Sequence, residues 1–432
     1  MERKIVKDLI AWKNNPQKKP LLLQGARQVG KTYSLLSFGK EHYKSTAYFS
    51  LEESGEYIAV FERDLKPERI INEFSALSGV QILPHDTLII FDEIQASEKA
   101  LTSLKYFAEQ APQYHIVSAG SLLGVAVGRE NFSFPVGKVD MLSLFPMDFE
   151  EFLWALGKNE FCALIRESID AFTPLSFHDT AMDLYKTYLV VGGMPTAVLE
   201  YVNKQDFDFV KVALKTLNNS YIADMAKYAT AQETIRIKAA WESIPAQLAK
   251  ENRKFQYKVI KSGARATDYE LSLDWLTSAE MINKCINVSE GKMPLAGYAD
   301  NNTFKIYMVD TGLLCSKFDI AANVVLHTPP SFYGFKGALC ENYICQALVT
   351  LGIKPYYWTS KGKAEVDFVF QDKSGNIIPL EAKSAENVRS KSLRSYRDIY
   401  MPEYAIRVSG KNFGFENGIK SIPLYALFAL SI

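Results

Sequence analysis

The chain has 432 residues, 48% hydrophobic and 23% charged, so it is long enough for about three globular domains and is not of a disordered or fibrous class. Its 49 basic and 49 acidic residues give a net charge of zero, so the overall charge does not indicate nucleic-acid binding. The five cysteines lack metal-ligand spacing, no apolar run reaches the length of a membrane span, and residues 1–20 are charged throughout, so we expect a cytoplasmic protein without membrane contact.

The first predicted strand, 21–24, leads into a glycine-rich loop and then a predicted helix over 33–42. The loop consists of Gly25, Ala26, Arg27, Gln28, Val29, Gly30, Lys31 and Thr32, a complete GxxxxGKT pattern. In that strand–loop–helix context, backbone N–H groups and the helix N-terminus wrap phosphates. Lys31 then contacts the β- and γ-phosphates, and the Thr32 hydroxyl binds Mg²⁺. The loop predicts ATP as ligand and Mg²⁺ as cofactor.

Further strands are predicted at 47–51, 88–91 and 115–118, with helices between them. The strand 88–91 is apolar throughout, as expected when both faces of a parallel sheet are covered, and it ends in Asp92 and Glu93. We expect Asp92 to complete the Mg²⁺ shell through water and Glu93 to polarise the water that attacks the γ-phosphate. After the strand 115–118, Ser118 or Ser121 is a candidate polar sensor. The βαβ pattern predicts an α/β fold with a P-loop parallel-sheet core.

From 149 to about 285 the pattern is helical, with a break at Gly192-Gly193-Met194-Pro195. A short hairpin with a strand over 304–309 follows, which fits a winged helix-turn-helix. A new unit with a helix, a long hairpin and more helix and strand begins near 328. We therefore predict three domains: an ATPase domain with a helical extension over 1–190, a winged-helix-like domain over 191–327, and a third domain over 328–432.

The segment 232–270 combines basic and aromatic residues. Its eight basic residues are Arg236, Lys238, Lys250, Arg253, Lys254, Lys258, Lys261 and Arg265, against five acidic ones, and Phe255, Tyr257 and Tyr269 are interleaved. Such a surface suits the phosphates of double-stranded DNA. An ordinary solvated helical face fits the pattern about equally well, and winged helices also dock proteins.

The third unit carries carboxylates on a predicted hairpin. If the turn centres on Ser374, paired residue numbers add up to 748, and Asp367 faces Glu381. Opposed carboxylates repel unless a divalent cation lies between them, and Lys383 is close enough to position a water. Glu341 lies seven residues before Leu348, near the apolar side of the preceding helix, where a carboxylate needs a partner. Spacing alone leaves two alternatives: a Mg²⁺ or Mn²⁺ site, or a solvated surface with a salt bridge.

Taken in order, these motifs resemble the AAA-superfamily ATPases of bacteria and archaea that carry a restriction-endonuclease-like C-terminal domain. The resemblance covers nearly the whole chain. It rests on seven strings: the loop 25–32, Phe91-Asp92-Glu93-Ile94-Gln95, residues 145–153, Gly192-Gly193-Met194-Pro195, residues 305–313, Glu341-Asn342-Tyr343, and Glu365-Val366-Asp367-Phe368 with Glu381-Ala382-Lys383.

The resemblance implies an ATPase core, a helical and winged-helix middle and an α+β nuclease-like domain. It places Glu341, Asp367 and Glu381 at metal-ligand positions and Lys383 at the catalytic lysine of a PD-(D/E)xK site. Val366 replaces the proline of that motif.

The second departure from the family is Gly137-Lys138, where the family has Gly-Arg before the apolar segment. Lysine does not replace a guanidinium that reaches the γ-phosphate of a neighbouring subunit. Either Lys138 serves weakly, or Arg129 acts as the finger, or hydrolysis is slow.

Our lead hypothesis is a DNA-associated, Mg²⁺-dependent ATPase that couples nucleotide state to the nuclease-like module and forms a homo-oligomer. The alternatives are an ATP-controlled switch or scaffold for a protein partner, with a silent nuclease-like domain, and an active metal nuclease licensed by ATP.

Overall fold

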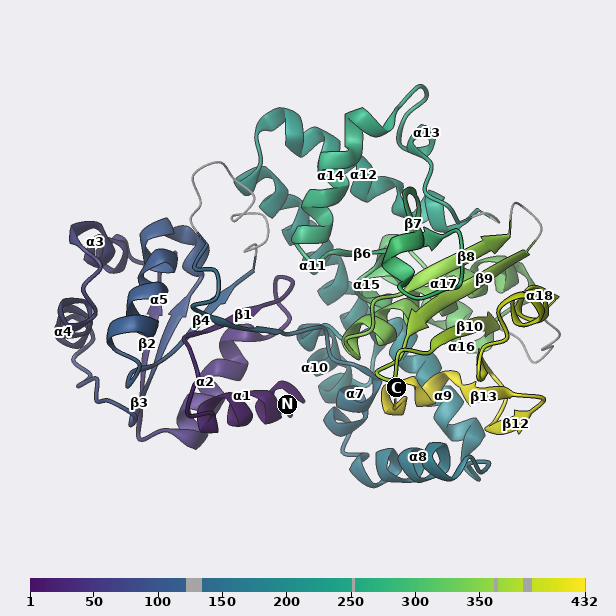
Figure 1. The fold of residues 1–432 in the computed structure, drawn as a ribbon, viewed down its shortest axis with the longest axis horizontal. Helices are drawn as coiled ribbons and strands as arrows, with labels where there is room; N and C mark the ends of the chain where they lie inside the picture. The colour runs from purple at the N-terminus through teal and green to yellow at the C-terminus, as the bar shows by residue number, and fades with distance from the viewer. Residues whose placement is uncertain (122–133, 251–252, 361–363, 384–390, 432) are drawn as a thin grey trace. The chain divides into compact units, whose positions relative to one another are not determined.

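The computed structural model describes residues 1–121, 134–250, 253–360, 364–383 and 391–431 (Figure 1). It separates into two compact units. The N-terminal unit comprises Glu2–Phe145 with Ser278–Glu280, and the C-terminal unit comprises Pro146–Thr277 and Met281–Ile432. The domain boundaries predicted at 190/191 and 327/328 both fall inside the C-terminal unit.

The N-terminal unit contains a five-stranded parallel sheet in the order β2-β3-β4-β1-β5. Its strands are β1 (Leu21–Gln24), β2 (Ser45–Ser50), β3 (Thr87–Asp92), β4 (His115–Gly120) and β5 (Asp140–Ser143). The first four were predicted within two residues at each end. The edge strand β5 was not predicted, because its short sequence, Asp-Met-Leu-Ser, is only partly buried and has no clear alternation.

Helices complete this α/β unit (Figure 1). They are α1 (Ile5–Asn14), α2 (Lys31–His42), α3 (Gly55–Arg63), α4 (Pro67–Ser78), the 3₁₀ turn η1 (Ile94–Ala96) and α5 (Glu98–Gln110). One face of the sheet packs on α3, α4 and α5 through an apolar core that includes Phe49, Phe61, Phe74, Phe91 and Leu104. The helix α2 contacts the strands β2, β3 and β4. The predicted P-loop parallel-sheet architecture is confirmed.

The C-terminal unit contains an eight-stranded mixed sheet in the order β12-β13-β11-β10-β9-β8-β6-β7. Its strands are β6 (Ile282–Val288), β7 (Ala299–Met308), β8 (Tyr356–Ser360), β9 (Ala364–Gln371), β10 (Ile377–Lys383), β11 (Ala405–Ser409), β12 (Gly414–Glu416) and β13 (Ile419–Pro423). The antiparallel pair β6–β7, which we expected as the hairpin of a winged helix, joins this sheet through the parallel pairing of β6 with β8.

Most of the remaining chain is helical. The elements are α7 (Phe149–Ala155), α8 (Asn159–Ala171), α9 (His178–Val191), α10 (Pro195–Lys204), α11 (Phe207–Tyr228), α12 (Ala231–Leu248), α13 (Tyr257–Ile260), α14 (Ala266–Ser278), η2 (Leu295–Tyr298), α15 (Thr311–Lys317), α16 (Ala322–His327), η3 (Pro330–Phe332), α17 (Tyr333–Thr350), α18 (Lys391–Tyr400) and η4 (Leu424–Ala429). The apolar helix α17 packs on β6, β7 and β10, and α18 packs on β9 and β10.

The predicted register of the β9–β10 hairpin is confirmed. Phe368 pairs with Leu380 and Phe370 with Ile378, so paired residue numbers add up to 748. Across the described residues, no helix combines the length and apolar character required of a membrane span.

Candidate functional site

The glycine-rich loop joins β1 to α2, as predicted. Gly30 caps the N-terminus of α2 with φ = 95°, a left-handed conformation that favours glycine. At Gly25 the limit is space, because a Cβ atom there would lie 2.3 Å from the carbonyl oxygen of Leu144. Both glycines are therefore required by the path of the loop, and the backbone N–H groups at the start of α2 form the kind of cradle that binds phosphate.

Arg3, from the N-terminal segment, stabilises this loop through hydrogen bonds. Its guanidinium donates hydrogen bonds to the carbonyl oxygens of Val29, at 2.7 Å, and Phe145, at 2.6 Å. The side chain is buried, so these charge-assisted bonds are shielded from water. Arg3 thus fixes the middle of the loop to the segment that follows β5.

Lys31 lies inside the loop, with only 7% of its surface exposed. Its ammonium group donates to the carbonyl oxygens of Gly25, at 2.8 Å, and Ala26, at 3.0 Å. Burial lowers the pKa of Lys31 to about 8, and the neighbouring Glu93 carboxylate opposes that shift. A phosphate chain in the cradle would supply the negative charge that this buried cation needs.

Thr32 and Asp92 meet at the carboxyl end of β3. The Thr32 hydroxyl donates to Asp92 Oδ2 at 2.6 Å, and the Tyr48 hydroxyl from β2 donates to the same oxygen at 3.0 Å. All the ligands in this group are oxygen atoms, the donors that Mg²⁺ prefers. The donor set therefore fits a Mg²⁺ ion held by Thr32 directly and by Asp92 directly or through water.

Glu93 follows Asp92 in the left-handed conformation, with φ = 50°. Such a conformation is uncommon for a residue with a side chain and occurs often at functional sites. The Glu93 carboxylate accepts hydrogen bonds from Gln95 and, at 3.2 Å, from the hydroxyl of Ser121. The structure brings Ser121 to the predicted catalytic carboxylate, whereas it shows no described partner for the Ser118 hydroxyl.

Lys138 lies near the amino ends of the strands of this sheet, whereas the phosphate loop follows the carboxyl end of β1. Lys138 precedes β5, whose first residue, Asp140, pairs with Leu21 at the amino end of β1, and its ammonium contacts Glu109 at 2.8 Å. Lys138 therefore does not reach the loop of its own chain, and its predicted role concerns a neighbouring subunit. Arg129 lies outside the described residues.

The predicted acidic residues of the C-terminal unit gather on β9, β10 and α17. Asp367 on β9 is partly buried and accepts a hydrogen bond from the backbone N–H of Ala382 at 2.9 Å. Burial raises the pKa of Asp367, while the positive charges of Lys305 and Lys383 oppose that rise. Lys383 donates to Glu381 at 2.7 Å.

Cationic side chains hold the remaining carboxylates of this group. Glu341 on α17 pairs with Arg253, accepts a hydrogen bond from Tyr307 at 2.9 Å and lies 3.5 Å from the Lys305 ammonium. Lys305 is 1% exposed and also contacts Glu365 at 2.6 Å. We call Arg253, Lys305, Glu341, Glu365, Asp367, Glu381 and Lys383 the acidic–basic cluster.

The acidic–basic cluster does not fit a metal ion in this arrangement. In the part of the chain that the structure describes, no three His, Cys, Asp or Glu side chains are placed to hold one. The reason is that the carboxylates already face ammonium and guanidinium groups. The metal-ligand role of Glu341, Asp367 and Glu381 stays a prediction that this geometry does not support.

The same contacts change the interpretation of the basic segment 232–270. Arg253 was counted as a surface residue, but its side chain is 17% exposed and paired with Glu341. Lys250 lies 3.3 Å from the side-chain oxygen of Gln256. The segment therefore presents a smaller basic surface than its composition indicated.

Four residues at these sites were not predicted: Arg3, Tyr48, Gln95 and Lys305. Gln95 lies in the quoted 91–95 string, so its distance of two residues from Glu93 was a usable signal. Lys305 interrupts an apolar strand, which marks a buried cation that needs a partner. Arg3 contacts Val29 and Phe145, which are distant from it in the sequence, and Tyr48 reaches Asp92 because β2 pairs in parallel with β3. Local sequence does not reveal such contacts.

Family models match three separate segments of the chain. Residues 17–153 match an AAA domain, residues 182–323 match a domain of unknown function (DUF8612), and residues 336–427 match another (DUF4143). No curated protein matches the sequence.

Solved structures with similar folds include the Walker-type ATPase PABY2304 of Pyrococcus abyssi, with 15% identity, TM-score 0.43, and coverage of 73% of this chain and 95% of that one. The ORC2 protein of Aeropyrum pernix in ADPNP and ADP complexes has 12% identity, TM-score 0.34, and coverage of 77% and 90%. AMPPCP-bound DnaA of Aquifex aeolicus has 14% identity, TM-score 0.28, and coverage of 63% and 86%.

The family match and the loop geometry agree on the N-terminal unit. Residues 17–153 form an AAA-type domain, and the phosphate-binding loop, Asp92 and Glu93 lie within it.

Proposed function

We propose that the N-terminal unit binds Mg²⁺ and ATP and hydrolyses the γ-phosphate. One observation carries this proposal: the Thr32 hydroxyl and the Asp92 carboxylate lie 2.6 Å apart beside the buried Lys31, and Glu93 follows directly. A bound Mg²⁺ ion would supply positive charge to the β- and γ-phosphate oxygens.

Each side chain has a defined task in this reaction. Lys31 neutralises phosphate charge that develops in the transition state, and the N–H groups of the loop bind the phosphate oxygens. Glu93 orients the attacking water and accepts its proton. Ser121 and Gln95 hold the Glu93 carboxylate in place through hydrogen bonds, and both are neutral, so they leave its charge available.

The test is steady-state ATP hydrolysis by wild type and Lys31→Ala, with nucleotide binding measured by calorimetry. Loss of both binding and hydrolysis in Lys31→Ala is the expected result, and Lys215→Ala, at an exposed position on α11, is the matched control. Hydrolysis that persists in Lys31→Ala would show that the activity belongs to another site or a contaminant.

We further propose that the protein acts on DNA and that nucleotide state controls the nuclease-like C-terminal module. Support comes from exposed basic side chains on α12 and α13 and just after α13, notably Lys238, Lys258 and Lys261. ATP hydrolysis should rise when double-stranded DNA is added at low salt and fall back as salt increases. Indifference to DNA over the whole salt range counts against this part of the proposal.

A second candidate function is an ATP-controlled switch for a protein partner, with a silent nuclease-like module. The observation that favours it is the ion pairing of Glu341 with Arg253 and Lys305, which occupies the carboxylates that a metal would need. Plasmid cleavage with Mn²⁺, with and without ATP, separates the two functions. Cleavage abolished by Asp367→Ala and Lys383→Ala supports an active nuclease; no cleavage under either condition supports the switch.

We also propose a homo-oligomer in which Lys138 or Arg129 faces the nucleotide of the next subunit. Lys138 supports this because it lies near the amino ends of the strands, whereas the phosphate loop of the same chain follows the carboxyl end of β1. Mixing Glu93→Gln with Lys138→Ala subunits tests it: activity per subunit should depend on the mixing ratio if sites are shared, and should stay additive if they are not.

A further inference from the structure

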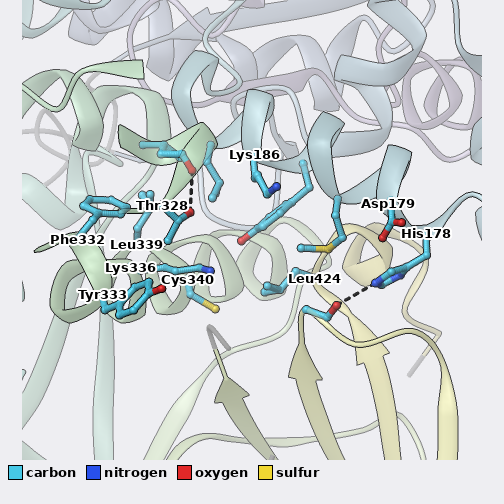
Figure 2. A pocket seen from close by; sticks show the side chains of 15 residues that line it. His178, Asp179, Lys186, Thr328, Phe332, Tyr333, Lys336, Leu339, Cys340 and Leu424 are labelled. Carbon is cyan, nitrogen blue, oxygen red and sulfur yellow. Dashed lines mark hydrogen bonds between the residues drawn. The ribbon is translucent and has the colours of Figure 1, made fainter. Parts of the chain in front are cut away.

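A cavity of about 560 Å³ lies within the C-terminal unit (Figure 2). Residues of α9 and of the 325–340 segment line it, together with Gly410 and Leu424. Its volume falls in the range of about 300–1,000 Å³ that is typical of small-molecule sites in proteins.

The walls of this cavity are mainly apolar. Met182 and Leu189 come from α9, Val325 from α16, Phe332 from η3, Leu339 from α17 and Leu424 from the start of η4. Leu339 is 1% exposed, so the floor belongs to the packed interior. A ligand that fills this space must therefore present a substantial apolar body.

Tyr185 on α9 also lines the cavity. Tyr185 is 3% exposed, and its hydroxyl has no hydrogen-bond partner among the described residues. An unpaired buried hydroxyl costs free energy that a hydrogen-bonding ligand would recover. The ring of Tyr185 packs edge-on against Tyr343, with 4.9 Å between the ring centroids.

Two lysines lie between the ends of the cavity, Lys186 on α9 and Lys336 on α17 (Figure 2). Lys186 donates to Asp183 at 2.8 Å, but the Asp183 side chain is 75% exposed. Such an exposed pair contributes little, and an ammonium group retains further N–H donors. Both lysines are partly buried, so an anion between them would be partly shielded from water.

His178 and Asp179 lie at one end of the cavity (Figure 2). His178 receives or donates hydrogen bonds at both ring nitrogens, to the Tyr425 hydroxyl at 3.0 Å and the Gly410 carbonyl at 2.9 Å. Because a carbonyl oxygen only accepts, His178 Nε2 donates to Gly410, and the two hydrogen bonds hold the ring in place. Asp179 is exposed, so it would repel an anion bound at this end and favour a position between the two lysines.

From these contacts we propose that the cavity binds a small amphipathic anion: an apolar chain or ring along the Leu189–Leu339 wall, with a carboxylate or phosphate head between Lys186 and Lys336 that also accepts a hydrogen bond from Tyr185. This site is separate from the proposed ATPase reaction and does not depend on it.

Decanoate is a suitable probe, and decyltrimethylammonium has a similar chain with the opposite charge. Calorimetry on the full-length protein should show saturable binding of decanoate at least about tenfold tighter than that of the cation, since a charge-assisted hydrogen bond contributes about 1.5–3 kcal/mol. Equal binding of the two probes, or none by decanoate, overturns the proposal.

Three variants localise the binding. Lys336→Met should weaken decanoate binding about tenfold, whereas Lys215→Met, at an exposed position on α11, should leave it unchanged. Met182→Trp places a large ring in the cavity and should abolish binding. If decanoate binds Lys336→Met and Met182→Trp as tightly as wild type, it binds elsewhere and the site is wrong.

Tyr185→Phe gives a readout that mere structural damage does not produce. Removing an unpaired buried hydroxyl should raise the melting temperature of the protein without probe, yet weaken decanoate binding severalfold. A lower melting temperature, or unchanged affinity, shows that the hydroxyl serves the fold and does not contact the ligand.

Discussion

The phosphate-loop site and the acidic–basic cluster each bring carboxylates and lysine together, but they hold the carboxylates differently. Asp92 and Glu93 accept hydrogen bonds from the neutral side chains of Thr32, Tyr48 and Ser121. In the cluster, Glu341 and Glu365 contact the charged Lys305. Neutral donors orient a carboxylate and leave its charge for a metal or a proton, whereas a buried cation cancels that charge.

This difference explains why similar residue types predict different chemistry. The first site keeps negative charge at the end of a strand, next to a loop that binds phosphate. In the second site, internal ion pairs neutralise the carboxylates and connect β7, β9 and α17. Charge balance therefore distinguishes these two groups of carboxylates, although their residue types are similar.

The largest expected effect is that of Lys305→Met on stability. It leaves Glu341 and Glu365 without their shared buried cation, and breaking a buried ion pair costs about 3–5 kcal/mol of unfolding free energy. Urea unfolding measures this loss. Lys284→Met, on the adjacent strand, breaks a pair with the half-exposed Asp274 and should cost less than about 1 kcal/mol.

The double variant Lys305→Met/Glu365→Gln should regain part of the unfolding free energy that Lys305→Met loses. Mn²⁺ binding by either variant, but not by wild type, would show that Lys305 prevents the carboxylates from holding a metal ion. A loss below about 1 kcal/mol in Lys305→Met would show that the cluster is not held by ion pairing.

Glu93→Gln should lower the rate of ATP hydrolysis about 10²- to 10³-fold and leave ATP binding near the wild-type value. The amide keeps the size of the side chain but cannot accept the proton of water. Single-turnover hydrolysis and calorimetry measure the two quantities. Glu160→Gln on α8 is the control, and a parallel loss of ATP binding would place Glu93 in nucleotide binding instead.

The lowered pKa of Lys31 predicts that the free energy of unfolding depends on pH. Its pKa in the folded protein is lowered to about 8, while the ordinary value applies in the unfolded chain. Between these values the unfolded chain binds more protons, so the stability of wild type should rise with pH from about 8 to about 10.5.

Lys31→Met lacks this term and should be the more stable protein below pH 8. The gap, on the order of 3 kcal/mol, should close as pH approaches 10.5. Unfolding free energies of both proteins from pH 7 to 10 check this, and a gap that does not change with pH contradicts the buried, destabilised ammonium.

The smallest expected effect is that of Tyr48→Phe. It removes one of the two hydroxyls that hold Asp92 Oδ2, and one hydrogen bond to a charged group contributes about 1.5 kcal/mol. The concentration of Mg²⁺ needed for half-maximal ATP hydrolysis should rise about three- to tenfold. No change would indicate that Thr32 alone positions Asp92.

Local sequence determined the parts of this protein that depend on short chain segments. The loop 25–32, four strands of the parallel sheet, the position of Asp92 and Glu93, and the register of β9 with β10 all follow from neighbouring residues, since backbone conformation and strand alternation are local.

Tertiary structure alone decided which charges meet. It placed Arg253 on Glu341, Lys305 between two carboxylates, and Tyr48 on Asp92, residues that are 88, 36 to 60 and 44 positions apart in the chain. It also joined β6 and β7 to the C-terminal sheet and left the Tyr185 hydroxyl facing no described partner. Such contacts depend on long-range packing, because the free energy of a charge is set by the groups that surround it in space.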